Sequence, residues 1–450
     1  MHDTPTDWLD HSSRAHPGRL AVADSAERLT YGELRKRAGA FAATLRDLGL
    51  APGDPVAIDL PAGVSHAVAL HGAILAGTVA QSMPPGGRAD VDVAPGAAFV
   101  DSETIERALS HEEAGSGWMS LRRHPGEPLT RVLSSGTSGD PKPVELTAGN
   151  HLWSALGSAV NLGVDADDAW LCCLPLNHVG GLSILVRSAI YGTAARIHEG
   201  FDVDCISAAI EAGEASLLSL VPTQLVRLLD AGAAIERPRL LLIGGGPLPR
   251  DVLDEALGRG ATVVQTYGLT EACSQVCTLS PGDARERAGS AGKPLPGVEV
   301  QVRESEIRVR GPIVAPAAAD ADGWLHTGDL GRVDADGYLW VEGRRSDLIV
   351  TGGENVRPER VEAALRQHPG VADVAVVGVD DREWGQTVVA YVVSRPGAAS
   401  PEWQLLALAR ERLAPHEVPK RIELREELPR TASGKLQRRR LVGGTGGTAS

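Results

Sequence analysis

The sequence predicts an α/β protein with a large N-terminal domain of doubly wound sheets, a small β-barrel-like part and a small, mobile α+β C-terminal domain. Strand-like and helix-like segments alternate through residues 29–271, which is typical of a doubly wound sheet. Apolar and polar residues alternate with period two in residues 297–310, which predicts a half-exposed antiparallel hairpin. A helix, two strands, a helix and a strand follow in residues 357–426, and this compact module predicts a separate domain.

The composition is that of a globular protein with a sizeable core. The chain has 450 residues, of which 43% are hydrophobic, and this length favours more than one domain. Its net charge of -14 argues against a nucleic-acid partner, because nucleic acids recruit proteins through Lys and Arg patches. The one dense basic run, residues 438–440, is interpreted as a solvated surface.

Cysteine usage and hydropathy predict a cytoplasmic location. The five cysteines show no metal-like pairing, and we interpret them as free thiols in a reducing cytosol. The N-terminus carries no apolar signal region, and no window reaches the roughly 18 apolar residues that a membrane span needs. We therefore expect no membrane insertion.

The first elements are a helix, a strand and a second helix. Residues 29–48 read as an amphipathic helix, and Thr30 with Glu33 resembles a capping box at its start. The apolar residues that share one face of this helix are Leu34, Ala38, Phe41, Ala42 and Leu45. A strand begins at Val56 and a helix covers residues 66–76, while the Gly-, Pro- and Asp-rich residues 84–95 are interpreted as a surface connection.

A loop at residues 133–143, LSSGTSGDPKP, has the composition of a phosphate-binding loop. The loop contains four Ser/Thr hydroxyls, two glycines and one lysine, and it lies between a strand-like segment and a second apolar segment that begins at Val144. Lys142 does not stand at the spacing of a Walker A lysine and a proline follows it, which disfavours a P-loop kinase or NTPase. A bare Gly/Ser surface loop is the alternative.

The middle of the chain repeats one pattern, in which an apolar strand ends in a polar turn. Strands are expected to begin at Trp170, Leu217, Leu240 and Thr262, with helices between them. His178 lies in the first of these turns, where ligand crevices open in such sheets. Several such turns at one sheet edge would make one composite site.

Other polar groups are weak signals by themselves. Glu271, in the turn YGLTE, is a reasonable magnesium ligand beside nucleotide phosphates, or equally an acid favoured at a helix N-terminus. The turn GGGPLP at Gly244 lets a planar group approach the backbone closely, or is only a tight bend. Asp329 offers a carboxylate that a ribose diol could bind, and Lys435 projects from a Pro/Ser/Gly loop or is an ordinary solubilising charge.

Six motifs, taken together and in order, resemble the adenylate-forming family of acyl-CoA synthetases, luciferases and adenylation domains. The motifs are SSGTSGDPKP, LPLNHVGGLS, QTYGLTE, GWLHTGDLG, GRRSDLIVTGGENVRPERVE and PRTASGK, and the resemblance covers about residues 7–440. It implies an AMP-forming acid–thiol ligase that uses ATP, Mg²⁺ and CoA. Asp140 and Pro143, in the phosphate loop, and Ser346, at the hinge, depart from the family's usual residues.

Within that family, three stretches look most like the ligases that join 2-succinylbenzoate to CoA in menaquinone biosynthesis. They are GNHLWSALGSAVNLG, LCCLPLNHVGGLSILVRSAIYG and GSAGKPLPG. A CoA ligase for another aryl or fatty acid and a stand-alone amino-acid adenylation enzyme are the alternatives. The expected partners are small molecules, and a homodimer would be unsurprising.

The resemblance also implies a domain division and a set of site residues. The expected division is an N-terminal domain at 1–343, a hinge at 344–347, a C-terminal domain at 348–442 and a flexible tail at 443–450. The residues that would bind ATP are Ser134, Ser135, Gly136, Thr137, Ser138, Gly139, Lys142, Gly245, Gly246, Pro247, Gln265, Thr266, Tyr267, Gly268, Thr270, Asp329, Arg344 and Lys435.

The remaining roles are implied in the same way. Lys435, Thr270, Glu271 and His178 would be catalytic, with Glu271 holding the metal ion. The acid would be bound by His178, Ser183, Arg187 and Gly244, although Arg187 is equally well interpreted as an ordinary surface cation. Gly352 and Gly353 would line the CoA tunnel, and Ser346 would be the hinge residue.

Overall fold

The chain forms two compact units in the computed structural model. The described residues are 8–84, 92–110, 123–134, 142–398, 400–431, 434 and 436–442. The first unit comprises Met1–Gln301, Arg308–His326 and Ala335–Leu339, and the second comprises Val302–Ile307, Thr327–Asp334 and Trp340–Ser450. Each unit has its own hydrophobic core.

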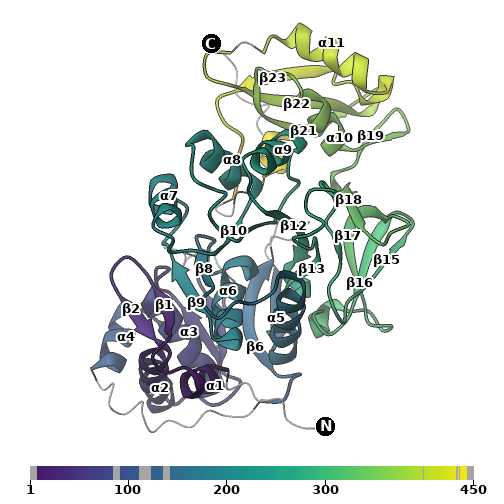
Figure 1. The fold of residues 1–450 in the computed structure, drawn as a ribbon. Coiled ribbons are helices and arrows are strands. Elements are labelled where there is room, and N and C mark those ends of the chain that lie inside the picture. Colours follow the sequence, from purple (N-terminus) through teal and green to yellow (C-terminus); the bar gives the residue numbers. More distant parts are fainter. Residues whose placement is uncertain are drawn as a thin grey trace, which may run out of the picture. The chain divides into compact units, whose positions relative to one another are not determined.

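Two sheets form the framework of the first unit (Figure 1). The smaller has the order β5 (Ala98–Val100), β3 (Pro55–Ile58), β4 (Val79–Ser82), β6 (Pro128–Ser134) and β7 (Lys142–Thr147). Its first four strands pair in parallel, whereas β6 and β7 pair antiparallel, with Ser134 opposite Lys142. The predicted phosphate loop therefore joins two paired strands.

The larger sheet has nine strands. In spatial order these are β14 (Lys293–Pro294), β13 (Ser274–Thr278), β12 (Val263–Leu269), β11 (Leu240–Ile243), β10 (Leu217–Leu220), β8 (Ala169–Cys172), β9 (Ala194–Ile197), β1 (Leu20–Ala23) and β2 (Arg28–Thr30). The six strands from β12 to β1 pair in parallel, and antiparallel strands extend the sheet at both ends. This mixed arrangement confirms the predicted doubly wound fold.

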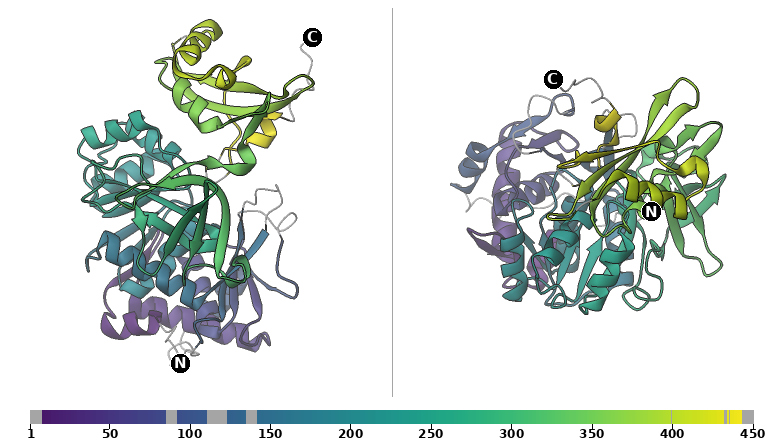
Figure 2. Two further views of the ribbon diagram at one scale, coloured as in Figure 1. Left: turned by 90° about the vertical axis from the view of Figure 1, so that its right-hand side faces the viewer. Right: turned by 90° about the horizontal axis from the view of Figure 1, so that it is seen from above.

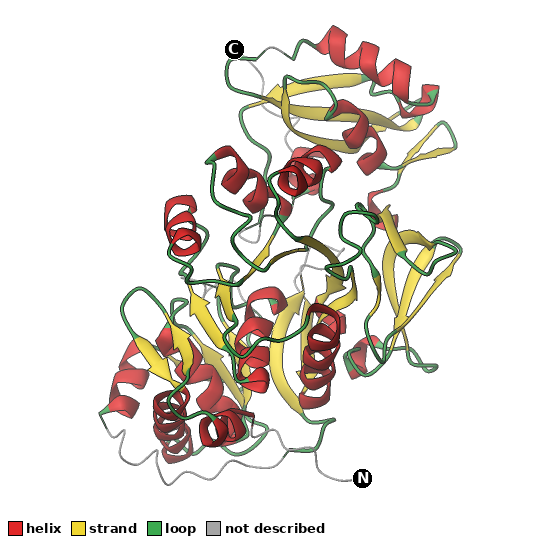
Figure 3. Cartoon of the chain, viewed as in Figure 1, coloured by secondary structure: helices red, strands yellow, loops and turns green. Residues whose placement is uncertain are grey.

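Helices flank the strands of both sheets (Figure 3). They are α1 (Trp8–Ala15), α2 (Tyr31–Asp47), α3 (Val64–Ala76), α4 (Ser102–Leu109), α5 (Ala148–Leu162), α6 (Val179–Tyr191), α7 (Val203–Glu211), α8 (Pro222–Asp230) and α9 (Arg250–Gly258). The Thr30–Glu33 capping box predicted at the start of α2 is present. One hydrophobic core contains residues of both sheets together with α2, α3 and α6, and α3 is buried along nearly its whole length.

A close helix contact explains one glycine of this core. Gly72 of α3 lies against α2, and a Cβ atom there would meet Phe41 Cδ1 at 2.6 Å and the Ala38 carbonyl oxygen at 2.7 Å. Any larger residue would push the two helices apart, because packed interiors have little space to give.

The second unit is built on a five-stranded sheet. Its strands are β20 (Glu354–Val356), β19 (Ile349–Thr351), β22 (Gly385–Ser394), β21 (Val371–Asp381) and β23 (Arg421–Arg425). Its helices are α10 (Pro358–Leu365), α11 (Glu402–Arg412) and α12 (Arg438–Val442). The predicted helix–strand–strand–helix–strand module is confirmed, whereas the short β19–β20 hairpin and α12 were not predicted.

Both faces of this sheet are covered. Val374 and Val376 of β21 pack with residues of α10 and α11, while Ala375 and Val377 pack on the other face with Leu441 of α12. Helices α11 and α12 accordingly lie on opposite sides of the strands (Figure 2). The alternation follows from the period of two along a strand.

A further sheet of four strands is formed by residues 299–344. Its order is β15 (Glu299–Arg303), β16 (Glu306–Arg310), β17 (Trp324–Val333) and β18 (Leu339–Arg344), and a short 3₁₀ turn lies at Pro316–Ala318. Another 3₁₀ turn, Pro415–Glu417, joins α11 to β23. The predicted hairpin is thus present, with Glu304 and Ser305 as its two-residue turn at φ of 50° and 64°. Positive φ at both turn residues gives the twist that adjacent strands require.

Across the described ranges, no helix is both long and apolar enough to cross a membrane. The basic run at residues 438–440 is only partly the solvated surface that we expected. Arg439 and Arg440 are exposed, but the Arg438 side chain is 20% exposed and forms ion pairs with three carboxylates. The expectation was wrong for Arg438 because its partners, Asp347, Glu359 and Glu362, are distant in the sequence.

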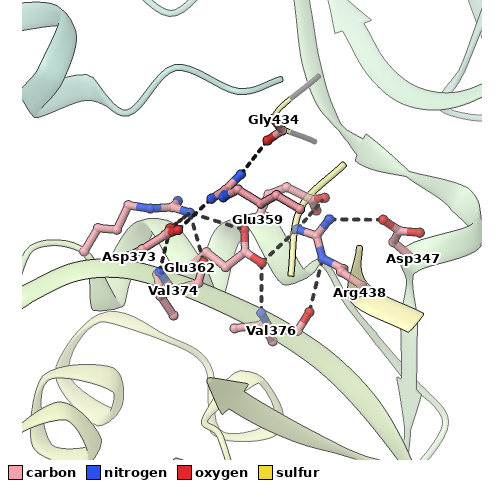
Figure 4. A network of polar contacts seen from close by, with 10 residues as sticks. Asp347, Glu359, Glu362, Asp373, Val374, Val376, Gly434 and Arg438 are labelled. Atoms are coloured by element: carbon pink, nitrogen blue, oxygen red, sulfur yellow. Dashed lines mark hydrogen bonds and ion pairs between the residues drawn. The ribbon is translucent and has the colours of Figure 1, made fainter. Parts of the chain in front are cut away.

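Glu359, on α10, is a half-buried carboxyl within this cluster (Figure 4). Burial raises its pKa to about 7, and repulsion by Glu362 and Asp347 adds to the effect, while Arg438 opposes it. Its Oε2 atom is buried without a hydrogen-bond partner among the described residues. Glu359 therefore holds a proton in the folded chain at a pH where an exposed glutamate has lost it.

We predict that Glu359→Gln stabilises the second unit at pH 8 but not at pH 4. The folded pKa of about 7 lies above the ordinary value of 4.5, so the wild type loses stability as pH rises between these values. Glutamine cannot ionise, so the variant should gain about 1–3 kcal/mol above pH 7. Hydrogen exchange of the β21 amides in the full chain measures this, with exposed Glu354→Gln as control. The same pH dependence in variant and wild type would contradict it.

Candidate functional site

The carboxyl ends of four neighbouring parallel strands meet at one edge of the nine-stranded sheet. Strands β8, β10, β11 and β12 are adjacent in that order, so their ends span about 15 Å at about 4.8 Å per strand. The turn after β8 carries His178, which is the N-cap of α6 and is half-buried. The structure thus brings His178 to the same edge as Gly244–Pro247 and Thr266–Glu271, in accordance with the composite site that we expected.

The glycine turn after β11 runs close to the end of β12. A Cβ atom on Gly244 would meet Thr266 Cγ2 at 2.8 Å, and Gly245 has a φ of +79°. The Gly244 N–H donates to the Leu220 carbonyl at 3.1 Å, which fixes the turn to the end of β10. The turn therefore presents bare backbone on which a planar ring could lie.

The side chains at the end of β12 already form hydrogen bonds within the protein or are buried. Gln265 Oε1 accepts a hydrogen bond from the Gly289 N–H at 2.7 Å, and Thr266 Oγ1 donates to the Cys277 carbonyl at 3.0 Å. Tyr267 is buried at the following position. These bonds tie β12 to its neighbours, so Gln265 and Thr266 would offer backbone atoms, more than side chains, to a ligand.

The turn after β12 is held in an unusual conformation. Cys273 and Ser274 have φ of 48° and 90°, and a Cβ atom on Gly268 would lie 1.7 Å from the Ser274 carbonyl oxygen. Positive φ in residues other than glycine costs about 1–3 kcal/mol each and persists only where the surroundings impose it. A 3₁₀ turn, Thr270–Ala272, is held inside this loop and carries Thr270 and Glu271.

Helix α5 supports this turn, and the sequence analysis did not identify its contribution. Ser154 Oγ donates to the Cys273 carbonyl at 2.6 Å, and His151 contacts the Cys273 Sγ through Nδ1 at 3.6 Å and Thr130 Oγ1 through Nε2 at 2.8 Å. Burial lowers the pKa of His151 to about 4, so this histidine is neutral at pH 7. Nothing local marks His151 or Ser154, since their partners are far along the chain.

The Glu271 carboxylate projects from the supported turn. It makes no hydrogen bond or ion pair with any residue that the structure describes, while its backbone carbonyl accepts from the Ala315 N–H at 2.8 Å. Within the same residues, no group of three His, Cys, Asp or Glu side chains could hold a metal ion. A single carboxylate fits a magnesium ion whose other ligands come from nucleotide phosphates and water.

Arg187 of α6 is a buried cation that forms an ion pair with none of the described residues. Its side chain is 4% exposed and stacks 3.9 Å from the centre of the Trp170 ring, and Nη1 donates to Ser158 Oγ at 3.3 Å. Its Nε is buried with no hydrogen-bond partner, and no carboxylate of the described ranges pairs with it. Burial lowers the pKa of Arg187. The interpretation of Arg187 as an ordinary surface cation is therefore wrong.

Ser183 lies one helical turn before Arg187. It is buried, and its hydroxyl donates to the Gly180 carbonyl of the same helix at 3.4 Å, which is a long hydrogen bond. Ser183 and Arg187 are four residues apart and so share one face of α6.

The predicted phosphate loop is only partly described. Ser134 ends β6 with a buried hydroxyl that has no partner in the described part of the chain, and Lys142 is exposed at the start of β7. Ser135, Gly136, Thr137, Ser138 and Gly139 lie outside the described residues, as does Asp140. The Ser134 hydroxyl, which has no partner among the described residues, is a group that an anion could satisfy.

In the second unit, the two residues expected at a ribose lie in direct contact. Arg344 Nε contacts Asp329 Oδ1 at 2.8 Å, and the Asp329 N–H donates to Thr327 Oγ1 at 3.0 Å. The Asp329 residue is 5% exposed, whereas the Arg344 side chain is 39% exposed. Arg344 therefore fixes the carboxylate while leaving part of the guanidinium accessible.

The hinge and CoA-binding predictions fall on short turns of the same unit. Ser346 lies in the 3₁₀ turn Arg345–Asp347 and donates from Oγ to Asp347 Oδ1 at 3.1 Å. Gly352 and Gly353 form the β19–β20 turn with φ of 57° and 85°, and a Cβ atom on Gly352 would meet the Trp384 ring at 2.8 Å. Lys435 lies outside the described residues.

Two family models match the chain, one in its N-terminal part and one in its C-terminal part. The family model described as AMP-binding enzyme matches residues 9–91 and 88–316, which contain the sheet-edge turns described above. The model for the AMP-binding enzyme C-terminal domain matches residues 360–435. The chain therefore belongs to the AMP-binding enzyme family, as the motifs predicted.

Individual members of this family are similar to the chain over nearly its whole length. A 2-succinylbenzoate–CoA ligase of Bacillus cereus is 36% identical, with 98% of each chain covered. The solved structure of o-succinylbenzoate CoA synthetase (MenE) from Bacillus subtilis with the acyl-adenylate OSB-AMP is similar at a TM-score of 0.86 and 33% identity, covering 100% of this chain and 99% of that one. The same protein with ATP and magnesium ion gives 0.83 and 34%, covering 97% and 99%.

We predict that Gly268→Ala disrupts the turn that carries Glu271. The new Cβ atom would meet a backbone oxygen, which cannot move as a flexible side chain would, so the free energy of unfolding should fall by about 1–3 kcal/mol or more. Gly258→Ala is the matched control, because Gly258 ends α9 with open space around it. Thermal unfolding of both variants measures the difference. Equal melting temperatures would contradict the close approach.

Proposed function

We propose that this chain is an ATP-dependent ligase that adenylates 2-succinylbenzoate and then transfers the acyl group to CoA, as a step of menaquinone biosynthesis. Pyrophosphate and AMP are the other products. The proposal is supported by the similarity, over nearly the whole length, to 2-succinylbenzoate–CoA ligases. It is also supported by the similarity to a solved structure of such an enzyme that holds the acyl-adenylate. The cosubstrates are ATP and CoA, and magnesium is the cofactor.

In the first step, a substrate carboxylate attacks the α-phosphorus of ATP and pyrophosphate leaves. Negative charge shifts among the phosphate oxygens, so preorganised donors and cations are the groups that lower the barrier. Glu271 would hold magnesium, which neutralises phosphate charge when bound. Thr270 would contact the α-phosphate. The Glu271 carboxylate has no partner among the described residues and belongs to a turn that α5 supports, which favours its assignment to magnesium. The loop from Ser134 to Lys142 would hold the β- and γ-phosphates.

The nucleoside would be bound by backbone and by one ion pair. The bare Gly245–Pro247 backbone and the Tyr267 ring would enclose adenine, as the close approach of the turn to β12 supports. Asp329 would accept hydrogen bonds from the ribose hydroxyls, with its carboxylate oriented by Arg344. A carboxylate held in this way has little conformational entropy left to lose on binding.

The acid would be bound at α6. 2-Succinylbenzoate has two carboxylates, and the one that does not react needs a cationic partner. Arg187 is such a cation, buried and without a carboxylate in the described residues, and Ser183 lies on the same helix face. His178 and Gly244, at the sheet edge, would contact the acid nearer to the reacting carboxylate.

Lys435 would bridge the attacking carboxylate and the α-phosphate in the first step. The thiol of CoA must later occupy that position, so the C-terminal domain would rotate about Ser346 between the steps and bring Gly352 and Gly353 to the CoA tunnel. The hinge, the domain limits, a homodimer and a cytoplasmic location remain predictions from the sequence.

We predict that 2-succinylbenzoate is preferred by about 100-fold or more in kcat/KM over benzoate, fatty acids and amino acids, since polar groups built to bind a second carboxylate discriminate strongly. Pyrophosphate release across this panel, with and without CoA, measures the preference. Comparable rates with a fatty acid would indicate a different acyl-CoA ligase. Activity with an amino acid and no thioester on addition of CoA would indicate an adenylation enzyme.

We predict that Arg187→Met raises KM for 2-succinylbenzoate by about 10- to 100-fold, because a charged hydrogen bond contributes about 1.5–3 kcal/mol. KM for ATP should not change. The matched control is an analogue of the acid in which hydrogen replaces the non-reacting carboxylate, and the substitution should leave its KM unchanged. An equal loss with both acids would mean that Arg187 has only a structural role.

A further inference from the structure

Two arginines flank Lys435 in the sequence and hold the chain on either side of it. Arg430 Nη1 donates to the Gly434 carbonyl at 2.8 Å, and Arg430 forms an isolated β-bridge with Leu436. The Gln437 N–H donates to the Pro429 carbonyl at 2.8 Å. The neighbours of Lys435 on both sides are therefore fixed to one short segment around Arg430.

Arg438, three residues beyond Lys435, binds the interior of the same unit (Figure 4). Its Nη2 contacts Glu362 Oε1 at 2.7 Å and Glu359 Oε1 at 3.5 Å. Nη1 contacts Asp347 Oδ2 at 3.2 Å, and Nε donates to the Val376 carbonyl at 3.3 Å. The guanidinium thus uses all three of its nitrogens, in directions that a lysine ammonium could not reproduce.

The acceptors of Arg438 are themselves held in place. Glu362 has a side chain that is 2% exposed, and its Oε1 also accepts from the Val376 N–H at 2.9 Å. Asp347 belongs to the turn Arg345–Asp347 that contains the proposed hinge residue Ser346. Arg438 therefore connects the segment after Lys435 to helix α10, strand β21 and the hinge turn.

Arg430 is anchored to the same region of charge. Its Nη2 contacts Asp373 Oδ2 at 2.6 Å, and Asp373 Oδ1 lies 4.0 Å from Arg366 Nη2. Arg366 in turn lies 3.7 Å from Glu362 Oε2. A continuous network of ion pairs thus runs from Arg430 to Arg438, the two arginines on either side of Lys435 in the sequence. Its members are Asp347, Glu359, Glu362, Asp373, Arg366, Arg430 and Arg438.

We propose that Arg438, together with Arg430, is a positioning residue for Lys435 and fixes the lysine segment to the hinge turn through Asp347. This inference rests on the proposed role of Lys435 in adenylation. Preorganisation is what a charge-stabilising group needs, because a displacement of about 1 Å can cost about 100-fold in rate. A loop rich in Ser and Gly does not provide it alone, and the two guanidinium groups do.

The test separates the two half-reactions in the full-length enzyme. Arg438→Gln should slow pyrophosphate release with 2-succinylbenzoate by about 10- to 100-fold. KM for ATP and for the acid should stay within about twofold, and so should thioester formation from supplied acyl-adenylate and CoA. Arg440→Gln, an exposed arginine of the same helix, is the matched control and should behave as the wild type.

A double-mutant cycle shows whether Arg438 acts through Lys435. Lys435→Ala alone should slow pyrophosphate release by at least about 10²- to 10³-fold and spare thioester formation. Adding Arg438→Gln to it should cause no further loss in either assay. If Arg438→Gln does not fold, Asp347→Asn, which removes only a half-buried carboxylate, takes its place in every assay.

The outcomes distinguish the inference from the proposed function. A further tenfold loss in the double variant, or an equal loss in both half-reactions for Arg438→Gln, overturns the positioning role while leaving the ligase proposal intact. Normal pyrophosphate release by Lys435→Ala overturns the proposed role of the lysine itself. Absence of any reaction with 2-succinylbenzoate in the wild type overturns the proposed function.

Discussion

The parallel pairing of β8, β10, β11 and β12 is the constraint on which the first unit's site depends. Parallel neighbours place their carboxyl ends at one sheet edge, so the pairing of the strands alone makes four turns from residues 173–271 adjacent. The apolar strands are buried and cannot slip. The turns can therefore consist of glycine backbone and strained residues, because the sheet and α5 stabilise them.

Arg187 and Arg438 show two solutions to the burial of a positive charge. Arg438 is surrounded by carboxylates, one of which, Glu359, has its pKa raised to about 7, and such a cluster fixes geometry at some cost in desolvation. Arg187 has an aromatic ring and a hydroxyl but no acid within the described ranges. Burial without a counter-ion is unfavourable, so a bound carboxylate would gain from meeting it. The surroundings of Arg438 are therefore suited to positioning, and those of Arg187 to binding a ligand.

Local sequence signals predicted the elements well and the long-range contacts poorly. The capping box of α2, the place of His178 at a helix start and the alternation in β15 and β16 depend on neighbouring residues, and all were predictable. The partners of Arg438 lie as far as 91 residues away, and the backbone of Cys273 is imposed by contacts from α5. Such features follow from tertiary packing, which a single sequence does not display. The sequence predicted that Asp329 and Arg344 both lie at the ribose, but it did not predict the ion pair between them.

The central claim is that the chain activates its acid by adenylation before any thiol is involved. The most direct measurement mixes the enzyme with ATP, Mg²⁺ and 2-succinylbenzoate in the absence of CoA, quenches the mixture and identifies the bound species by mass spectrometry. The account predicts about one equivalent of the mixed anhydride of 2-succinylbenzoate and AMP per active site, with pyrophosphate formed in equal amount. An acyl phosphate with ADP, or no activated acid until CoA is added, would contradict it.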